Sequence, residues 1–590
     1  MVSWGLFFSV LQLVILGAVS CFILWVIERR HKHGLFKRLG VPGPKPDLFW
    51  GNWTQLKRDR IQVMHEWIAK YGKVFGIYMG DKPHMVLTDT NMIKECFIKP
   101  SKIFQDRPMF FIDAEPFSSA LTFLKGEKWR ELRSLFNTCF TTSKVKDLFS
   151  AVDVCTTEFV KKMDALSRSG DPIDVYHNAH CLTLDTLAKT VLTWQVNFQM
   201  DEDNPTVSRL CTVFQQMDET AIESFFAFPL LRAALRCVYP FSDFCRNMRE
   251  VSNDVLKILN WRRSPKAPRE KDVLQYLIDL QTANEGATEK TRRYARALND
   301  STLLSNIIML LAVGFDSTSS SLAFVFYLLA KHPEEQEKIR AEVVAKMESL
   351  KAAKIDRVND QSTASDQQEP EKPDIIKMLH KNNASQFYET DKSHQKPQGQ
   401  MQSNASDATR RDDTVTGNAN IEETLQECTL EADDILTLER LDMVVREGLR
   451  LYPALPVMIL RECAQDTTVL GHYIPRGTTV VAPPWYIHRD PKIWSDPDEF
   501  IPDRFAKREQ STLSSMYFPF GLGSHICLGQ RLAMLMMKTV LYKTIYAFEL
   551  SLSAEESGPM KVKVPGLLLN PVDPLRLQFK RRSGARKKLI

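Results

Sequence analysis

The sequence predicts a mainly α-helical protein with a small β-sheet region, held to a membrane by an N-terminal transmembrane helix. Three observations indicate this: an uncharged apolar run at the N-terminus, helical periodicity over most of the remaining chain, and one short hairpin pattern. The chain has 590 residues, of which 44% are apolar and 25% charged, so it can bury a large core. Its net charge of +5 is too small to indicate nucleic-acid binding.

The first segment, residues 1–27, is predicted to be a membrane anchor. Residues 4–27 carry no charged side chain, and they suffice to span a bilayer core as a helix. A basic flank at residues 28–33 follows and should remain cytosolic. A cleaved signal peptide is the alternative, with Ala18 and Ser20 as the small residues of a cleavage site, but the apolar run continues past them. We therefore expect an uncleaved, single-pass anchor.

The rest of the chain divides by composition. Residues 28–46 are predicted to be a basic and proline-rich linker, because proline and the residue before it resist the α-helical conformation. Residues 47–579 form the main domain. A polar insert at about 349–431 interrupts it and is predicted to be disordered, because it offers little apolar surface to bury. Residues 580–590 form a basic tail.

Three smaller features complete the outline. Residues 74–79 and 84–88 are predicted to be two strands of a hairpin, joined through residues 80–83. Lys587 and Lys588 resemble a dilysine retrieval address of endoplasmic reticulum membrane proteins, although a solvated basic tail explains them equally well. The eleven cysteines show no paired spacing, which indicates a reducing compartment rather than a disulfide framework.

One stretch near the C-terminus, residues 520–529, predicts an anionic metal ligand. It places a single cysteine, Cys527, in a glycine-rich loop directly before a predicted helix. A helix N-terminus favours the thiolate, which is the metal-binding form of cysteine. Gly523 permits a tight turn, Gly529 lets the helix lie close to a flat group, and Phe520 could cover one side of the sulfur. The alternative is a buried cysteine that acts only as a small apolar residue.

Two helices elsewhere carry unusual polar residues. Glu447 and Arg450 lie three residues apart on a predicted helix, so they share one face and can form a charge-assisted pair. Residues 303–330 are apolar enough to span a membrane, but Asp316 and the hydroxyl residues after it would be costly in lipid. We therefore predict a buried central helix, with a local kink near Gly314 that leaves room for a small molecule.

The spacing Phe-x-x-Gly-x-x-x-Cys-x-Gly at residues 520–529 resembles the haem-ligand loop of the cytochromes P450. Residues 39–44, 441–445 and 488–491 look most like family 3 of the animal cytochromes P450. The resemblance implies the cytochrome P450 fold with bound haem b, in which Cys527 is the axial ligand of the iron.

Further roles follow from this resemblance. Glu447, Arg450 and Arg504 resemble the family's structural triad, which holds the region of the cysteine loop. The groups implied to hold the haem propionates are Trp129, Arg133, Arg461 and His525, and His525 stands where many members have arginine.

The central helix also fits the family pattern, with departures. Asp316 with Ser317 or Thr318 is implied to deliver protons during oxygen activation. Ser317 replaces the usual threonine, and Val313 is bulkier than the usual residue over the iron.

The implied activity is insertion of one oxygen atom from O2 into a lipophilic substrate, such as a sterol or steroid, a fatty acid or a xenobiotic. Electrons would come from NADPH through NADPH-cytochrome P450 reductase, with cytochrome b5 as a further candidate partner. The implied location is the endoplasmic reticulum membrane, with the catalytic domain in the cytosol. The alternatives are a haem-thiolate isomerase or dehydratase that acts on peroxides, and a haem-binding protein without turnover.

Two sets of surface and pocket residues remain. A docking patch for an acidic reductase is expected at Lys507, Arg508 and Lys538. Candidate substrate-pocket residues are the aromatic clusters at 110–117, 225–228 and 241–244, together with Phe315, residues 454–459 and residues 566–569.

Overall fold

The computed structural model describes residues 2–99, 102–108, 118–201, 239–282, 288–365, 421–506, 515–554 and 560–582, with a few single positions between them. The chain forms two compact units. The first contains Met1–Val344 and Ile421–Arg582, and it carries every candidate site residue. The second contains Ala345–Asn420 and Ser583–Ile590, of which residues 345–365 are described.

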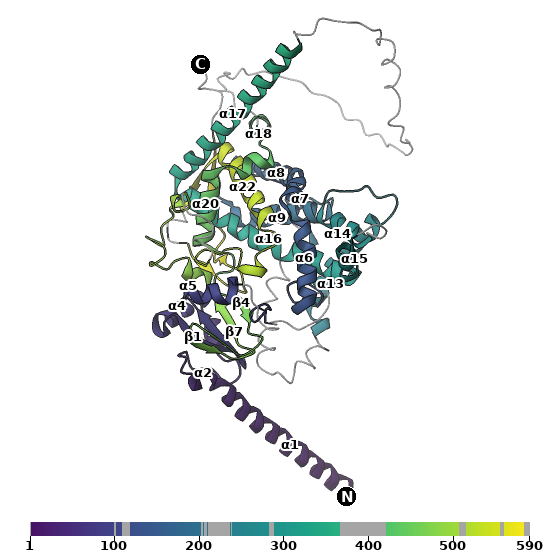
Figure 1. Ribbon diagram of the computed structural model, residues 1–590, viewed down its shortest axis with the longest axis vertical. Coiled ribbons are helices and arrows are strands. Elements are labelled where there is room, and N and C mark those ends of the chain that lie inside the picture. Colours follow the sequence, from purple (N-terminus) through teal and green to yellow (C-terminus); the bar gives the residue numbers. More distant parts are fainter. Residues whose placement is uncertain are drawn as a thin grey trace, which may run out of the picture. The chain divides into compact units, whose positions relative to one another are not determined.

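Helices make up most of the described chain, as the sequence predicts (Figure 1). The α-helices are α1 (Val2–His33), α2 (Leu35–Arg38), α3 (Trp53–Leu56), α4 (Arg60–Tyr71), α5 (Thr90–Ile93), α6 (Gly126–Cys139), α7 (Thr142–Asp147), α8 (Phe149–Ser167), α9 (Val175–Leu192), α13 (Asp243–Arg262), α14 (Val273–Thr282), α15 (Glu289–Ala297), α16 (Asp300–Lys331), α17 (Pro333–Ser365), α18 (Ile421–Glu427), α19 (Ala432–Leu436), α20 (Glu439–Leu451), α21 (Pro484–Ile487) and α22 (Gln530–Ala547). A π-helical turn, η1 (Lys94–Ile98), and the 3-10 turns η3 (Tyr239–Phe241), η4 (Pro502–Phe505) and η5 (Gly523–His525) complete the helical elements.

The strands form small sheets. They are β1 (Val74–Met79), β2 (Lys82–Leu87), β3 (Ile173–Asp174), β4 (Ile459–Glu462), β5 (Thr467–Val469), β6 (His472–Ile474), β7 (Thr479–Ala482), β8 (Phe548–Leu552), β9 (Val562–Lys563), β10 (Asn570–Pro571) and β11 (Arg576–Arg581). The largest sheet has the order β1-β2-β7-β4, a second has the order β3-β11-β8, and β5–β6 and β9–β10 are two-stranded pairs.

The predicted hairpin is present, with a shorter turn than expected. β1 and β2 pair antiparallel, and Pro83 lies opposite Tyr78 inside the ladder rather than in the turn. Pairing of β2 with β7 begins only at His84, so the missing N–H of Pro83 leaves no gap on that side.

The predicted central helix is α16, which packs against α9, α13, α20, α22 and β8 (Figure 1). Its N-terminus is capped by Asn299, whose side chain accepts a hydrogen bond from the backbone N–H of Thr302. Among the residues described, α1 and α16 contain the two helices long and apolar enough to cross a membrane, but the α16 window is 72% buried in the protein. This confirms a buried core helix.

α16 is one continuous helix from Asp300 to Lys331, and Gly314 lies within it. The hydroxyl of Ser317 bonds to the carbonyl of Val313 at 2.8 Å, and that of Ser321 bonds to the carbonyl of Ser317 at 2.8 Å. These hydroxyls therefore bond to carbonyls of the helix itself, and the kink near Gly314 stays a prediction.

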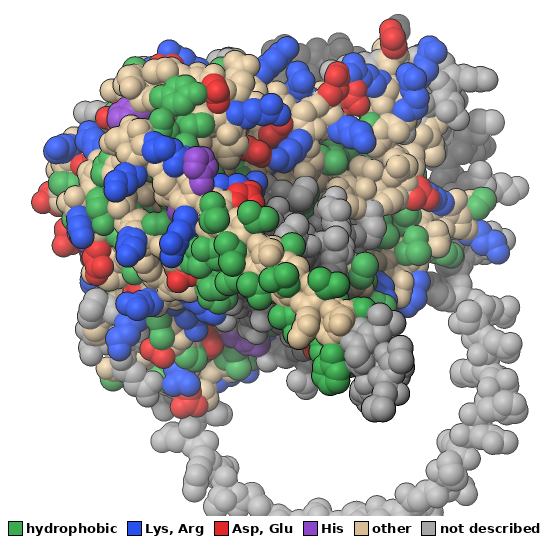
Figure 2. All heavy atoms as spheres, turned by 90° about the horizontal axis from the view of Figure 1, so that it is seen from below, with side chains coloured by type: hydrophobic (Ala, Val, Ile, Leu, Met, Phe, Trp, Pro, Cys, Tyr) green, Lys and Arg blue, Asp and Glu red, His purple; other side chains and the backbone are tan. Residues whose placement is uncertain are grey.

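The N-terminal helix α1 agrees with the predicted apolar anchor. Within Phe7–His33, its 18-residue apolar window has a mean hydropathy of 2.6 and is 0% buried. Large hydrophobic side chains are exposed along it, as Figure 2 shows.

The predicted linker differs from expectation, because helix continues through its first part as the end of α1 and as α2. Arg29 is buried and donates to the carbonyls of Leu48 and Phe49. Its Nη1 lies 3.5 Å from Oδ1 of Asp81, at the tip of the β1–β2 hairpin. His33 Nε2 lies 2.9 Å from the carbonyl oxygen of Gly80. Only the part after α2 can act as a proline-rich spacer.

The boundaries of the predicted insert also move inward. α17 continues to Ser365, and the chain is helical again from Ile421 in α18. Cys428 and Leu430 are buried, and α18 packs against α8 and α22. Residues 421–431 therefore belong to the packed body, while residues 366–420 lie outside the described residues.

Candidate active site

The cysteine loop is closed by its own backbone. The N–H of Cys527 donates to the carbonyl of Phe520 at 2.8 Å, and η5 forms the turn between them. Gly523 has φ +60°, and a Cβ there would lie 1.9 Å from the carbonyl oxygen of Phe97. Glycine is therefore required at this position. As predicted, a helix, α22, starts directly after Gly529.

Cys527 has the surroundings of an anionic ligand. Desolvation raises the pKa of its thiol, while the backbone N–H of Gly529 and the charges of Arg133 and Arg107 act in the opposite direction. The side chain is nevertheless exposed, so it borders an open space while protein surrounds it on its other sides. A cation at the sulfur would offset the desolvation and favour the thiolate.

Three arginines lie at the cysteine loop: Arg133 and Arg107 act on Cys527, and Arg461 donates to Leu522. Burial, followed by the charge of Arg107, lowers the pKa of Arg461 to about 9. Burial, followed by the charge of Arg133, lowers the pKa of Arg107 to about 10. Among the residues that the structure describes, no carboxylate forms an ion pair with any of the three. The cluster is therefore a site for an anionic ligand.

The donors of this cluster are partly used by the protein. Arg461 donates to the carbonyls of Leu460 at 2.7 Å and Leu522 at 2.8 Å. Arg133 donates to the carbonyl of Ile526, but its buried Nε has no hydrogen-bond partner. A buried unpaired donor is costly, so an acceptor supplied by a ligand would stabilise it.

Trp129 and His525 stack on each other, with ring centroids 4.0 Å apart and an interplanar angle of 18°. Nε2 of His525 lies 2.6 Å from the carbonyl of Gln105. Desolvation lowers the pKa of His525 to about 2, assisted by the charges of Arg461 and Arg107. The imidazole is therefore neutral, and Nε2 is the donor to Gln105, because a carbonyl can only accept.

Arg107 is the residue that the sequence did not reveal. It is positioned because the chain before it runs beside β4: Glu462 N donates to Asp106 O at 2.8 Å, and Ala464 N donates to Ile103 O at 2.8 Å. This pairing joins segments more than 350 residues apart, and no local pattern indicates it.

The predicted triad is assembled in the core. Glu447 receives two bonds from Arg450, both 2.8 Å, and Nε of Arg504 lies 3.2 Å from the same carboxylate. Arg450 also donates to the carbonyl of His488 at 2.7 Å, and Nε2 of His488 accepts the N–H of Phe518 at 3.0 Å. A continuous hydrogen-bonded path therefore joins the triad to the start of the cysteine loop.

On α16 the predicted residues point in different directions. Val313 is 45% exposed although it lies in the middle of a buried helix, and Ser317 is partly exposed one turn later. Thr318 is buried. Asp316 is also buried and faces α9, where its Oδ1 lies 3.0 Å from Nε2 of His180, a partner that the sequence did not reveal.

The pocket candidates have mixed outcomes. Phe315 is buried, and its ring contacts that of His180 on α9 at a centroid distance of 5.6 Å. Residues 454–459 and 566–569 do meet, since Leu569 N donates to Ala454 O at 2.9 Å. The aromatic residues at 110–117 and 225–228 lie outside the described residues.

The expected docking patch is corrected at one position. Lys538 is buried and lies 2.8 Å from Asp442, so it cannot present its charge to a partner. Lys507 and Arg508 lie outside the described residues.

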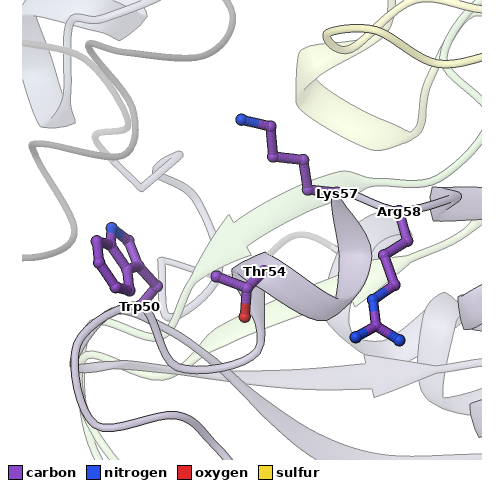
Figure 3. Close-up of a pocket in the computed structure, with 4 residues that line it drawn as sticks. All are labelled: Trp50, Thr54, Lys57 and Arg58. Carbon is purple, nitrogen blue, oxygen red and sulfur yellow. The ribbon is translucent and has the colours of Figure 1, made fainter.

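A surface pocket of about 380 Å³ lies elsewhere, on α3 and the residues that flank it (Figure 3). Trp50, Thr54, Lys57 and Arg58 line it. It contains none of the residues discussed above, so we do not assign it to the active site.

The residues present fit a haem group. Cys527 offers a thiolate, and the three arginines, with the unpaired Nε of Arg133, suit two propionates. A Cβ at Gly529 would meet no protein atom within 4 Å, which leaves the surface beside the sulfur free for a flat ring. The fold and the site thus define a haem-thiolate protein.

Comparison with known proteins agrees. The family model "Cytochrome P450" matches residues 41–360 and 417–579. Cytochrome P450 3A6 of Oryctolagus cuniculus is 27% identical over 98% of this chain and 99% of its own. Cytochromes P450 3A7 and 3A5 of Homo sapiens are each 27% identical, over 94% and 97% of this chain and the same shares of their own.

The chain therefore belongs to the cytochrome P450 family, and it is a monooxygenase that binds haem b. The predicted resemblance to family 3 is confirmed, since these relatives are all cytochromes P450 3A.

Proposed function

We propose that the protein inserts one atom of O2 into a lipophilic substrate, a sterol or steroid, a fatty acid or a xenobiotic, with electrons from NADPH. NADPH-cytochrome P450 reductase would supply them, and cytochrome b5 would be a further donor. The observation that carries this proposal is the exposed Cys527 beside three arginines that lack a described acidic partner.

When bound, haem supplies the redox chemistry of oxygen activation, which thiolate donation favours. The chain holds it in the proposed scheme: Cys527 as iron ligand, with Arg133, Arg461 and Arg107 as propionate donors. His525 adds little charge, because it is neutral and its Nε2 is already bonded. Trp129 keeps its ring in place by stacking.

The chain also handles protons and substrate. Asp316 would hold a proton at its carboxylate, and the hydroxyl of Ser317 would pass it on; Thr318 is the second candidate for that step. The exposed side chain of Val313 offers an apolar contact to a lipophilic substrate and narrows the space above the flat group.

We place the protein in the endoplasmic reticulum membrane, with α1 as a single span and the catalytic domain in the cytosol. The exposed apolar surface of α1 supports the span, and the basic residues at its end support the orientation. Its end is fastened to the catalytic domain through Arg29, so the membrane would lie beside the β1–β2 hairpin.

The test uses the full chain in phospholipid nanodiscs with reductase, NADPH and a panel of lipophilic compounds. We expect NADPH-dependent hydroxylated product and, after reduction under carbon monoxide, the red-shifted band of thiolate-ligated haem. Cys527→Ala should abolish that band, while Cys21→Ala, at an exposed cysteine of α1, should keep it.

Other outcomes would identify the alternatives. Product from a peroxide without NADPH would support an isomerase or dehydratase. A normal haem band with no product under any condition would support a haem-binding protein without turnover. An unshifted band in folded wild-type protein would contradict thiolate ligation.

A further inference from the structure

His180 of α9 and Asp316 of α16 form a pair, and the proposed function assigns a role to Asp316 but none to His180. Nε2 of His180 lies 3.0 Å from Oδ1 of Asp316, and Nδ1 lies 3.0 Å from the carbonyl of Tyr176. The two side chains are 15% and 11% exposed.

The hydrogen bonds of His180 determine how many protons the pair holds. The carbonyl of Tyr176 can only accept a hydrogen bond, so Nδ1 must carry a proton. Nε2 then needs a second proton, or Asp316 must be protonated, because an unprotonated Nε2 and a carboxylate are both acceptors. The pair therefore holds one proton between Nε2 and Oδ1, either as imidazolium and carboxylate or as imidazole and carboxylic acid.

The ring of His180 is fixed in this arrangement. It packs edge-on against Tyr176, with centroids 4.3 Å apart at 87°, and lies 5.6 Å from the ring of Phe315 at 66°. Thr183 also ties the two helices, because its hydroxyl donates to the carbonyl of Phe315 at 3.1 Å. The contacts on both sides keep Nε2 directed at Asp316.

The pair lies between the solvent-exposed side of α9 and the buried middle of α16. His180 is partly exposed and His177, one turn earlier on α9, is exposed, whereas Asp316 is buried. Asp316 is followed directly by Ser317, whose partly exposed hydroxyl shares a face of α16 with Val313. Among the residues described, His180 is the one ion-pair partner of Asp316.

We propose that His180 is a proton-relaying residue that recharges Asp316. This rests on the proposed monooxygenase function, which consumes substrate, O2, two electrons from NADPH and two protons, and yields hydroxylated product and one water. In each relay, the one shared proton, held on Oδ1 of Asp316, passes to the hydroxyl of Ser317, which passes on its own. Nε2 of His180 then takes a proton from solvent hydronium and shares it with Oδ1, which restores the starting state of the pair.

The test compares His180→Gln with wild type as haem-loaded, full-length enzyme with reductase. Glutamine can still donate a hydrogen bond to Asp316, but it cannot transfer a proton. We expect the haem band and the substrate-induced spectral change to be unchanged. Product formed per NADPH should fall by at least about tenfold, with peroxide released instead, and the solvent isotope effect on product formation should rise.

Two further variants make the outcome decisive. His332→Gln changes a more exposed histidine–glutamate pair, with Glu334 3.1 Å away, and should leave the product ratio unchanged. Asp316→Asn should reproduce the loss, and combining it with His180→Gln should add no further loss, because both act in one relay. If His180→Gln does not retain haem, Asp316→Asn takes its place in the comparison with wild type.

A wild-type product ratio and isotope effect in haem-loaded His180→Gln would overturn the proposal. Additive losses in the double variant would overturn it too. Failure of the wild-type enzyme to form NADPH-dependent product would instead contradict the proposed function.

Discussion

Arg29, at the end of the apolar helix α1, is ion-paired with Asp81 at the tip of the β1–β2 hairpin, and both residues are buried. The proposed anchor therefore ends in a fixed contact with the largest sheet, in place of the free basic linker that the composition suggests.

Removing this contact should loosen the anchor. Arg29→Ala leaves the buried Asp81 with Lys32 as its remaining ion-pair partner and should reduce the free energy of unfolding by about 1–3 kcal/mol. Trypsin should then cleave faster within residues 37–45. Arg30→Ala, at an exposed neighbour, is the control and should change neither measurement. Equal effects of the two variants would contradict the contact.

The same pair has a pH signature. Burial opposes ionisation of Asp81, but Arg29, Lys82 and Lys32 outweigh it and lower its pKa. A lowered folded-state pKa means that the stabilisation is complete above the ordinary value of 3.8 and is lost as the pH falls through the folded value. The resistance of residues 37–45 to proteolysis, measured with a protease that is active in acid, should therefore persist at mildly acidic pH.

Alanine should have different effects at two glycines of the cysteine loop, lowering apoprotein stability at one and haem incorporation at the other. Gly523→Ala places a Cβ 1.9 Å from the carbonyl oxygen of Phe97, at a residue with φ +60°. The free energy of unfolding of the apoprotein should therefore fall by roughly 2 kcal/mol or more. Gly529→Ala meets no protein atom within 4 Å and should leave apoprotein stability unchanged while lowering haem incorporation. Chemical unfolding of apoprotein and the haem-to-protein ratio separate the two effects. Full haem incorporation in Gly529→Ala would contradict the haem position inferred here.

His488 should make the loop sensitive to acid. Burial, followed by the charges of Arg450 and Arg489, lowers its pKa from 6.5 to about 3. Between pH 6.5 and about 3, His488 is protonated in the unfolded chain and neutral in the folded protein. The free energy of unfolding therefore falls as the pH drops through this range, by up to about 1.4 kcal/mol per pH unit. Protonation would also remove the acceptor for the N–H of Phe518.

Urea unfolding across this pH range gives the measurement. His488→Gln should flatten the slope by that amount, because glutamine does not titrate. The exposed His31 provides the control variant, His31→Gln, which should retain the wild-type slope. An unchanged slope in His488→Gln would show that His488 does not carry the acid response.

The insert can be tested with two deletions. Replacing residues 366–420 with a glycine–serine linker should leave haem content unchanged, because the packed unit resumes at Ile421. Extending the deletion to residue 431 removes the buried Cys428 and Leu430 and should lower stability and haem content. Equal haem content in both proteins would mean that α18 is dispensable.

Local patterns explain why much of the site could be predicted. The loop around Cys527 and the pair Glu447 and Arg450 each lie within a few residues, where helix and turn geometry fix the arrangement. The fold class followed from periodicity in the same way.

Residues brought in from distant segments could not be predicted. Arg107 reaches the site because residues 103–106 run beside the chain around β4, and His180 meets Asp316 because α9 packs on α16. The prediction that Lys538 belongs to an exposed docking patch was wrong for the same reason, because the sequence does not show which face of α22 packs against Asp442.

The polar middle of α16 has a consequence for biosynthesis. The helix is apolar enough to resemble a second membrane span, and it follows α1, the helix proposed to be the anchor, in the order of synthesis. An aspartate at a helix centre opposes insertion by about 2.5–3.5 kcal/mol on the scale of the insertion machinery. Asp316 lies at the middle of α16, so the residue proposed to carry protons would also oppose insertion of this core helix into the bilayer.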